Sequence, residues 1–228
     1  MVLSAMLTLN EFIEACILGL PPNIAKVIIP VAALAYDNFF YRYRRNGELL
    51  LSHSARVYEF IQPFNFGPEA ESAALGHDLL EDGLHLTFRE LEALLGSFGE
   101  YSTTFMIVMM TRVVRPGLDP IIDNRRIFDE YYDKLVWGTR RRPELPFIKV
   151  KDRFDGHNSP YGKSPEKELA YIAETEGEFS GMLWRCRSHT PFCLRDDLDL
   201  EVEKLLAKTK ERRLALIEQI KYPLALSA

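Results

Sequence analysis

Apolar residues recur at helical spacing along most of the 228-residue chain, which limits the folds open to it. No segment sustains the alternation of apolar and polar residues that a half-buried strand needs. The segment 50–61 places one apolar helical face through Leu50, His53, Val57, Phe60 and Ile61. The sequence therefore predicts an all-α fold.

Helix-ending signals divide the chain into a series of predicted helices. The expected ranges are 9–20, 23–44, 50–61, 68–83, 87–99, 101–114, 125–141, 146–158, 164–187 and 199–222. Thr87 and Glu90 have the spacing of a capping box at the start of one of them. We expect one helical domain over 1–185 and a helical extension over 186–228, which either docks on the domain or forms a homodimer contact.

Composition narrows the class of protein. Apolar residues make up 47% and charged residues 27% of the chain, which is typical of a soluble globular protein. The net charge of -5 disfavours broad nucleic-acid binding. Three cysteines are too few for a disulfide framework, and the apolar run 26–36 is too short to cross a bilayer. We expect a cytoplasmic protein without a signal peptide, with no nucleic-acid partner and no membrane partner.

The stretch 74–83, ALGHDLLEDG, sets His77, Asp78, Glu81 and Asp82 among Ala, Leu and Gly. On one continuous helix from Pro68 to Gly83, all four side chains would share a broad stripe. Like charges one turn apart cost about 0.2–0.5 kcal/mol on an exposed helix, and more where they are buried. A solvated acidic face with an incidental histidine is the simpler interpretation. The apolar neighbours favour burial instead, and a divalent cation would then compensate the charges.

Two further residues can complete a metal site. His53 lies 24 residues before His77 on the preceding predicted helix, and Asp152 ends the apolar run of 146–152. Each alone is more typical of a packed histidine or a helix-end acid. Together with His77 and Asp78 they offer two imidazoles and two carboxylates, a donor set that suits Mn²⁺ or Fe²⁺, with Zn²⁺ also possible. Glu81 and Asp82, one turn beyond, would be placed to take a proton from an attacking water.

These motifs resemble those of HD-domain phosphohydrolases, and within them the RelA/SpoT-type alarmone hydrolases. HDLLEDG is similar to the family's H-D-x-x-E-D, and RRNGELLLSH to the segment carrying its first metal-binding His. LEALLGSFGE, MMTR, FIKVKDRFDGHN and SPEKELAYIAETEGEF resemble four later segments in the same order. The resemblance covers about residues 30–180 and stops short of a synthetase domain, so it implies a small stand-alone hydrolase.

The resemblance implies that His53, His77, Asp78 and Asp152 hold Mn²⁺, and that Glu81 and Asp82 activate and position water. It also implies that Arg44 packs against a guanine base. The substrate would be the guanine nucleotide (p)ppGpp, cleaved at its 3′-pyrophosphate to give GDP or GTP and pyrophosphate. Further substrate contacts are expected from Arg45, Lys151, Arg153 and Asn158, with Lys149 nearby. For Arg45, Lys149 and Lys151, a solvated basic edge without a substrate contact is an equally favoured interpretation.

Three positions depart from the family pattern. Ser54 replaces Pro, and Gly83 replaces Thr after the acidic pair. Gly156 stands where the family has a nucleotide-binding Asn, four residues after its last metal-binding Asp. Either Asn158 serves after a short insertion, or Asp155 or His157 substitutes, or the nucleotide differs. An HD phosphohydrolase for another nucleotide or dinucleotide phosphate is therefore the alternative, and a non-catalytic nucleotide-binding regulatory module is a third hypothesis.

Two other clusters carry less weight. Cys186, His189 and Cys193 have spacings that suit zinc, but no fourth ligand follows and a proline divides them. The run Arg140–Arg142 is more typical of a solvated loop than of a nucleic-acid site, given the acidic net charge.

Overall fold

The computed structural model describes residues 8–44, 47–83, 86–96, 101–113, 123–158 and 164–221, together with Gly117 and Asp119. The fold is all-α, as predicted, and the described residues form no strand beyond an isolated bridge between Tyr43 and Leu49. None of the described helices is both long and apolar enough to cross a membrane. The elements are α1 (Leu9–Ile17), α2 (Pro22–Phe39), α3 (Leu50–Ile61), η1 (Gln62–Phe64), α4 (Pro68–Leu75), α5 (Leu79–Asp82), α6 (Phe88–Gly96), α7 (Tyr101–Met110), α8 (Asn124–Thr139), α9 (Leu145–Asn158), α10 (Pro165–Glu174), η2 (Thr175–Phe179), α11 (Ser180–Arg187) and α12 (Phe192–Lys221).

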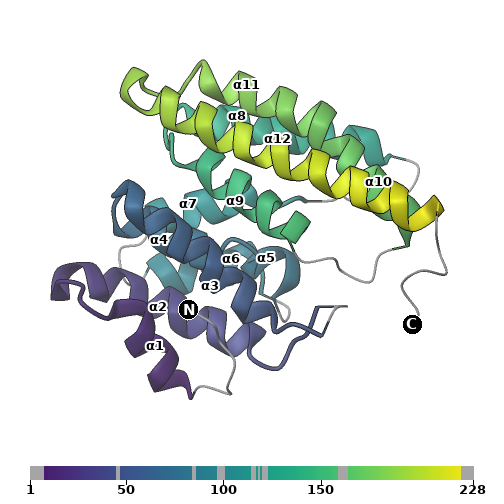
Figure 1. The fold of residues 1–228 in the computed structure, drawn as a ribbon. Coiled ribbons are helices and arrows are strands. Elements are labelled where there is room, and N and C mark those ends of the chain that lie inside the picture. Colours follow the sequence, from purple (N-terminus) through teal and green to yellow (C-terminus); the bar gives the residue numbers. More distant parts are fainter. Residues whose placement is uncertain are drawn as a thin grey trace.

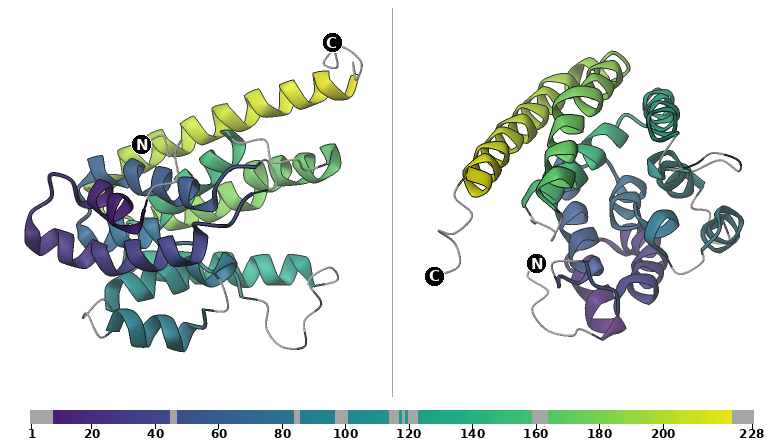
Figure 2. Two further views of the ribbon diagram at one scale, coloured as in Figure 1. Left: turned by 90° about the horizontal axis from the view of Figure 1, so that it is seen from below. Right: turned by 90° about the vertical axis from the view of Figure 1, so that its right-hand side faces the viewer.

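Helix α9 lies between two groups of helices (Figure 1). The N-terminal helices pack on one side of it through α3, and α12 runs along its other side (Figure 2). Leu145, Phe147, Ile148 and Val150 of α9 are buried in the common core. Because α9 also carries Asp152, the core itself fixes the position of that carboxylate.

Several helix ends follow their sequence signals. Helix α3 spans Leu50–Ile61, the predicted range. The capping box before α6 is present: the Glu90 amide donates to Thr87 Oγ1 over 3.2 Å, and the Thr87 amide donates to Glu90 Oε2 over 2.8 Å. Helix α1 ends just before Gly19, whose φ of +78° favours glycine.

The predicted continuous helix over 68–83 is wrong, because α4 ends at Leu75 and α5 begins at Leu79. The Gly76 amide still bonds to Ser72, but the Leu79 amide bonds to Gly76 in a three-residue turn. A Cβ atom at Gly76 would lie 2.9 Å from side-chain atoms of both Leu79 and Val31. This close packing keeps the chain at residue 76 against α2, and His77 and Asp78 occupy the turn instead of a helical stripe.

The C-terminal region packs directly on the rest of the protein. Helix α12 begins at Phe192, earlier than the predicted Asp199, and its residues Leu198, Val202 and Leu205 are buried. It contacts α9, α10 and α11. The predicted boundary between residues 185 and 186 falls inside α11. The Met-rich helix α7 ends at Met110, and the predicted ends at Val114 and Tyr222 lie outside the described residues.

Candidate metal centre

The side chains of His53, His77 and Asp152 meet between α3, the turn after α4, and α9, and Asp78 lies beside the two histidines. The two imidazole Nε2 atoms are 3.1 Å apart. Asp152 Oδ1 lies 3.2 Å from His53 Nε2 and 3.6 Å from His77 Nε2. Asp78 has Oδ1 3.2 Å from His77 Nε2 and Oδ2 3.6 Å from His53 Nε2. His53 and Asp152, 99 positions apart in the sequence, are thus brought together by the packing of these elements.

The tautomers of both histidines follow from their outer hydrogen bonds. His77 Nδ1 donates to the Ala74 carbonyl over 2.8 Å, because a carbonyl only accepts. His53 Nδ1 donates in the same way to Asp155 Oδ2 over 2.7 Å. In the neutral rings both Nε2 atoms then carry lone pairs, which face each other and cannot bond to one another. Two lone pairs and two carboxylates so close together call for a positive charge, which a proton or a metal ion can supply.

The pKa values around the cluster agree with this requirement. Burial alone would lower the pKa of His77, but the Asp78 and Asp152 carboxylates raise it to about 9. Burial alone would raise the pKa of Asp152, yet Lys149 and the two imidazoles hold it well below its usual value. Lys149 is one turn away on α9, with Nζ 2.5 Å from Asp152 Oδ2. The surroundings therefore favour a cation between ionised carboxylates.

The donors fit a divalent metal ion. His53, His77 and Asp152 each present a ligand atom, and these atoms all lie within 4.8 Å of one another. Imidazole nitrogens combined with carboxylate oxygens suit Mn²⁺, Fe²⁺ and Zn²⁺. The outer hydrogen bonds of both histidines match the support that metal-binding imidazoles usually receive.

Asp155 is a site residue that the sequence interpretation considered only as a substitute for Asn. It is 3% exposed. Besides His53, it accepts hydrogen bonds from Arg56 Nε at 2.6 Å and Arg56 Nη2 at 2.8 Å, and Arg44 Nη1 lies 3.7 Å away. Burial opposes its ionised form, but Arg56 and His53 hold the pKa of Asp155 well below its usual range. The i,i+3 spacing from Asp152 is the signal that points to it, because both residues then face α3.

The two predicted acids, Glu81 and Asp82, lie on the short helix α5 and reach solvent. Glu81 accepts a hydrogen bond from the backbone amide of Arg112. Partial removal of the carboxyl group from water raises the pKa of Glu81. The negative charge of Asp78 raises it further, whereas the positive charge of Lys149 lowers it. The pKa of Asp82 is raised by the same two causes, against the effects of Arg42 and Arg44.

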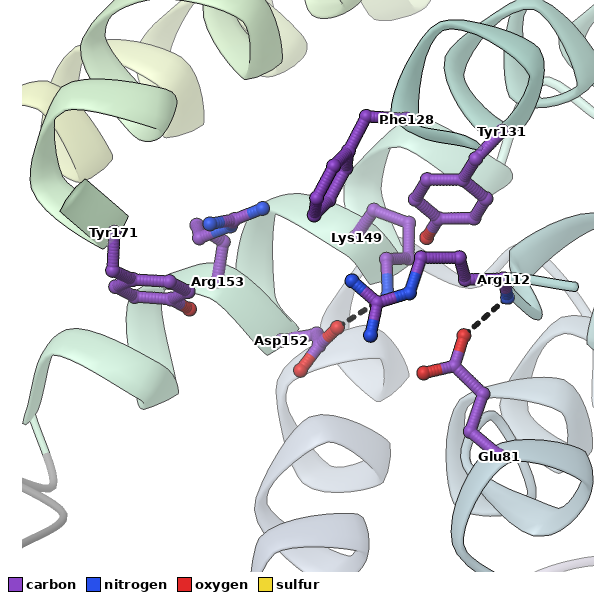
Figure 3. A pocket seen from close by; sticks show the side chains of 8 residues that line it. All are labelled: Glu81, Arg112, Phe128, Tyr131, Lys149, Asp152, Arg153 and Tyr171. Atoms are coloured by element: carbon purple, nitrogen blue, oxygen red, sulfur yellow. Dashed lines mark hydrogen bonds and ion pairs between the residues drawn. The ribbon is translucent and has the colours of Figure 1, made fainter. Parts of the chain in front are cut away.

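A cavity of about 140 Å³ opens beside Asp152. Its walls come from α5, α8, α9 and α10 and from the segment after α7, and Figure 3 shows Glu81 and Asp152 on its two sides. Arg112, Lys149 and Arg153 supply three cations to the wall. The remaining lining residues are the aromatic Phe128, Tyr131 and Tyr171.

The residues predicted to bind substrate are placed differently from one another. Arg153 lines the cavity, with its guanidinium carbon 4.3 Å from the Tyr171 ring centroid and 4.5 Å from that of Phe179. Lys151 does not line it and lies over the rings of Phe60 and Phe154. Arg44 lies near Asp155, as described above, and Arg45 lies outside the described residues. Arg112 and the three aromatic residues of the wall were not predicted, since their positions depend on how α8 and α10 pack.

At Gly156, where the family that the sequence resembles has asparagine, Tyr171 of α10 fills the space beside α9. A Cβ atom at Gly156 would overlap the Tyr171 hydroxyl, so glycine allows this ring to approach α9. Of the three possible substitutes, Asp155 is bound to His53 and Arg56. His157 is buried, with its ring 4.9 Å from that of Tyr171 and Nε2 3.1 Å from Thr175 Oγ1. Asn158 is exposed at the end of α9.

The second possible zinc site does not form among the described residues. Cys186 is buried and accepts a hydrogen bond from Thr139 Oγ1 over 3.3 Å, whereas Cys193 is exposed. His189 Nε2 lies 3.4 Å from Arg140 Nε instead. Within the described part of the chain, neither cysteine joins a cluster of three potential ligands.

Comparisons with protein-family models and with curated proteins give no match for this chain. The geometry of the metal cluster and its cavity is therefore the basis on which a function is proposed.

Proposed function

We propose that the protein is a metal-dependent phosphohydrolase. The observation that carries this proposal is the convergence of two imidazole lone pairs and the carboxylates of Asp78 and Asp152 beside a cavity lined by cations. His53, His77, Asp78 and Asp152 would hold the ion. When bound, a divalent cation such as Mn²⁺ supplies charge neutralisation at phosphate and activation of water.

The cavity residues bind and orient the phosphate groups. Arg112 is exposed on the wall, and Lys149 and Arg153 lie deeper, each paired with one carboxylate. The guanidinium groups can contact phosphate oxygens in bidentate fashion, while Lys149 acts as a point charge. Arg153 is clamped by the rings of Tyr171 and Phe179, so its orientation costs little further entropy on binding.

Glu81 takes the proton of the attacking water, and Asp82 helps position that water. Glu81 lines the cavity opposite Asp152, and the amide of Arg112 fixes one of its oxygens. Its raised pKa improves it as a base, because a proton acceptor works best when its pKa is near the operating pH. The cations on the wall stabilise the negative charge of the phosphoryl group that the water attacks.

The substrate we propose first is (p)ppGpp, cleaved at its 3′-pyrophosphate to GDP or GTP and pyrophosphate. Support comes from the order of the motifs over residues 30–180, which resembles that of the RelA/SpoT-type hydrolases. In this reaction Arg44 would contact the guanine base. It stands at the edge of the cluster beside Asp155.

A different nucleotide is the second candidate, and position 156 favours it. Tyr171 occupies the space of the family's asparagine side chain, and both Asp155 and His157 are engaged elsewhere. The contacts to the nucleotide therefore differ from the family pattern even where the metal ligands agree. A binding module without turnover is the third candidate, and it would bind nucleotide without releasing product.

Metal content and turnover test the proposal together. Purified protein loaded with Mn²⁺ is incubated with ppGpp and with a panel of other nucleotides, and pyrophosphate or phosphate release is measured. His77→Ala should lose both bound metal and activity, whereas the control His189→Ala changes a half-buried histidine outside the cluster and should keep both. Glu81→Gln should retain metal and lose about 10²–10⁴-fold in kcat. Wild-type protein with full metal occupancy that hydrolyses no member of the panel would refute the proposal.

A further inference from the structure

A second and larger cavity, of about 520 Å³, lies between the start of α8 and the helical segment formed by α10 and η2. Its lining includes the aromatic Phe128 and the small residues Ala170, Ala173 and Gly177. Two carboxylates, Glu174 and Glu178, stand on the same segment. The five residues of η2 form a π-helix, a conformation that occurs frequently at functional sites.

This cavity adjoins the one at the metal cluster. Phe128 lines both of them. Arg153 lines the first and Glu174 the second, and the two are joined by an ion pair of 2.5 Å. Figure 3 shows the Phe128 side chain extending from α8 on the same side of the smaller cavity as Arg153. The two cavities are therefore neighbours, separated by Phe128 and by the Arg153–Glu174 ion pair, and a molecule that occupies both must pass over these side chains.

The two cavities differ in charge and in size. The smaller one has three cations on its wall, whereas the larger one has two carboxylates and one cation, Arg125. Carboxylates repel phosphate and accept hydrogen bonds from amino and imino groups. A cavity of about 140 Å³ suits phosphate groups, and about 520 Å³ is in the range of sites for ring-bearing small molecules.

We infer that the larger cavity, between α8 and α10–η2, is the subsite for the nucleobase end of a phosphorylated substrate. The base packs on Phe128 and beside Ala170, Ala173 and Gly177, in place of the contact with Arg44 that the resemblance implies, and its donor groups face Glu178. This inference rests on the proposed function, because it assumes that the phosphate end binds at the metal cluster. It makes a nucleotide, and not a small phosphate ester or inorganic polyphosphate, the substrate class.

Filling the subsite tests the inference. Gly177 is exposed, and a Cβ atom there would meet nothing within 4 Å, so Gly177→Trp places an indole in the cavity without disturbing the core. Gly181, four residues later on α11, has the same freedom and does not line the cavity, so Gly181→Trp is the matched control. Binding of ppGpp, GTP and ATP is measured on Mn²⁺-loaded protein by calorimetry, with inorganic tripolyphosphate as the probe without a base.

We expect Gly177→Trp to weaken binding of the best nucleotide by about 10-fold or more, since stacking of a base on an aromatic side chain is a large part of such affinities. Tripolyphosphate affinity should equal that of the wild type, and Gly181→Trp should change neither. Glu178→Gln keeps the volume and removes the charged acceptor, and we expect it to weaken nucleotide binding by about 2–10-fold. For a nucleotide that is turned over, Gly177→Trp should raise KM and leave kcat nearly unchanged.

The outcomes separate this inference from the proposed function. Equal nucleotide affinity in the Gly177→Trp and Gly181→Trp variants, or equal losses for nucleotide and tripolyphosphate, would overturn the inference even if the protein hydrolyses nucleotides. Selective loss of nucleotide binding in Gly177→Trp, in a protein that releases no product, would support the subsite and refute the hydrolase. Thermal unfolding of each variant checks that it is folded.

Discussion

Replacing Asp155 by Asn should uncouple His53 from its support. The carboxylate accepts from Arg56 Nε through Oδ1, and from His53 Nδ1 and Arg56 Nη2 through Oδ2. An amide has one oxygen, so its NH₂ group must face N–H donors on one of these two sides. If the NH₂ faces His53, the imidazole must move its proton to Nε2, which removes the lone pair that would bind a metal ion.

The size of the effect follows from burial and geometry. Breaking a buried ion pair costs about 3–5 kcal/mol. Arg56 also pairs with Glu48 and its side chain is 31% exposed, so the lower end of about 3 kcal/mol applies here. For a protein of this length the loss corresponds to a fall of about 6–12 °C in Tm. Because Asp155 supports a ligand, Mn²⁺ affinity should also fall by about 10–100-fold.

Calorimetric titration of metal-free protein with Mn²⁺, together with thermal unfolding, measures both effects. Asp199→Asn is the matched control: Asp199 binds Arg187 through the same bidentate geometry, with distances of 2.6 and 2.7 Å, but joins α11 to α12 and contacts no histidine. It should lower Tm by less, because this pair is more exposed, and leave Mn²⁺ affinity unchanged. An Asp155→Asn variant with lowered Tm and wild-type Mn²⁺ affinity would show that Asp155 stabilises the fold without positioning His53.

Three further results are expected. Gly76→Ala should lower the free energy of unfolding by about 1–3 kcal/mol and weaken metal binding, because a Cβ atom there meets Val31 and Leu79 at 2.9 Å. An unchanged unfolding free energy and an unchanged metal affinity would contradict this. Glu174→Gln should lower Tm at pH 7, and the difference in Tm from wild type should close as the pH falls below 4.5. Burial opposes the charge of Glu174, but Arg153 and Tyr132 hold its pKa below 4.5. The stabilisation from the carboxylate is therefore present above pH 4.5 and is lost on acidification. Thermal unfolding across pH measures this, and a constant difference would refute the linkage. Of the three cysteines, only Cys193 should react with a thiol reagent in the native state, because burial raises the pKa of Cys16 to about 12 and that of Cys186 to about 11. Counting labelled thiols before and after denaturation measures this. Labelling of either buried cysteine under native conditions would contradict the prediction.

Local sequence signals predicted the helical class and several helix ends well. The range of α3 and the capping box at Thr87 depend on side chains close in sequence, which is why they could be predicted. The break at Gly76 could not be predicted in this way. Residues 68–83 have a helical pattern throughout, and the turn arises because Val31 and Ile107, from two other helices, pack against a glycine.

The sequence by itself determined which groups are available for chemistry. His53, the pair His77–Asp78, and Asp152 are metal-binding residue types within or beside apolar segments. The prediction that failed was the continuous helix carrying His77, Asp78, Glu81 and Asp82, yet the donors still lie close together, because packing of α3, α4 and α9 fixes them.

Only the tertiary structure decided what surrounds the metal cluster. Asp155 supports His53, Tyr171 fills the space at Gly156, and Lys151 points away from the cavity while Lys149 lines it. Each of these outcomes depends on the rotation of α9 and on which helices cover it. Sequence periodicity gives the face of a helix that is buried, but contacts between distant helices determine which residue on that face meets which partner.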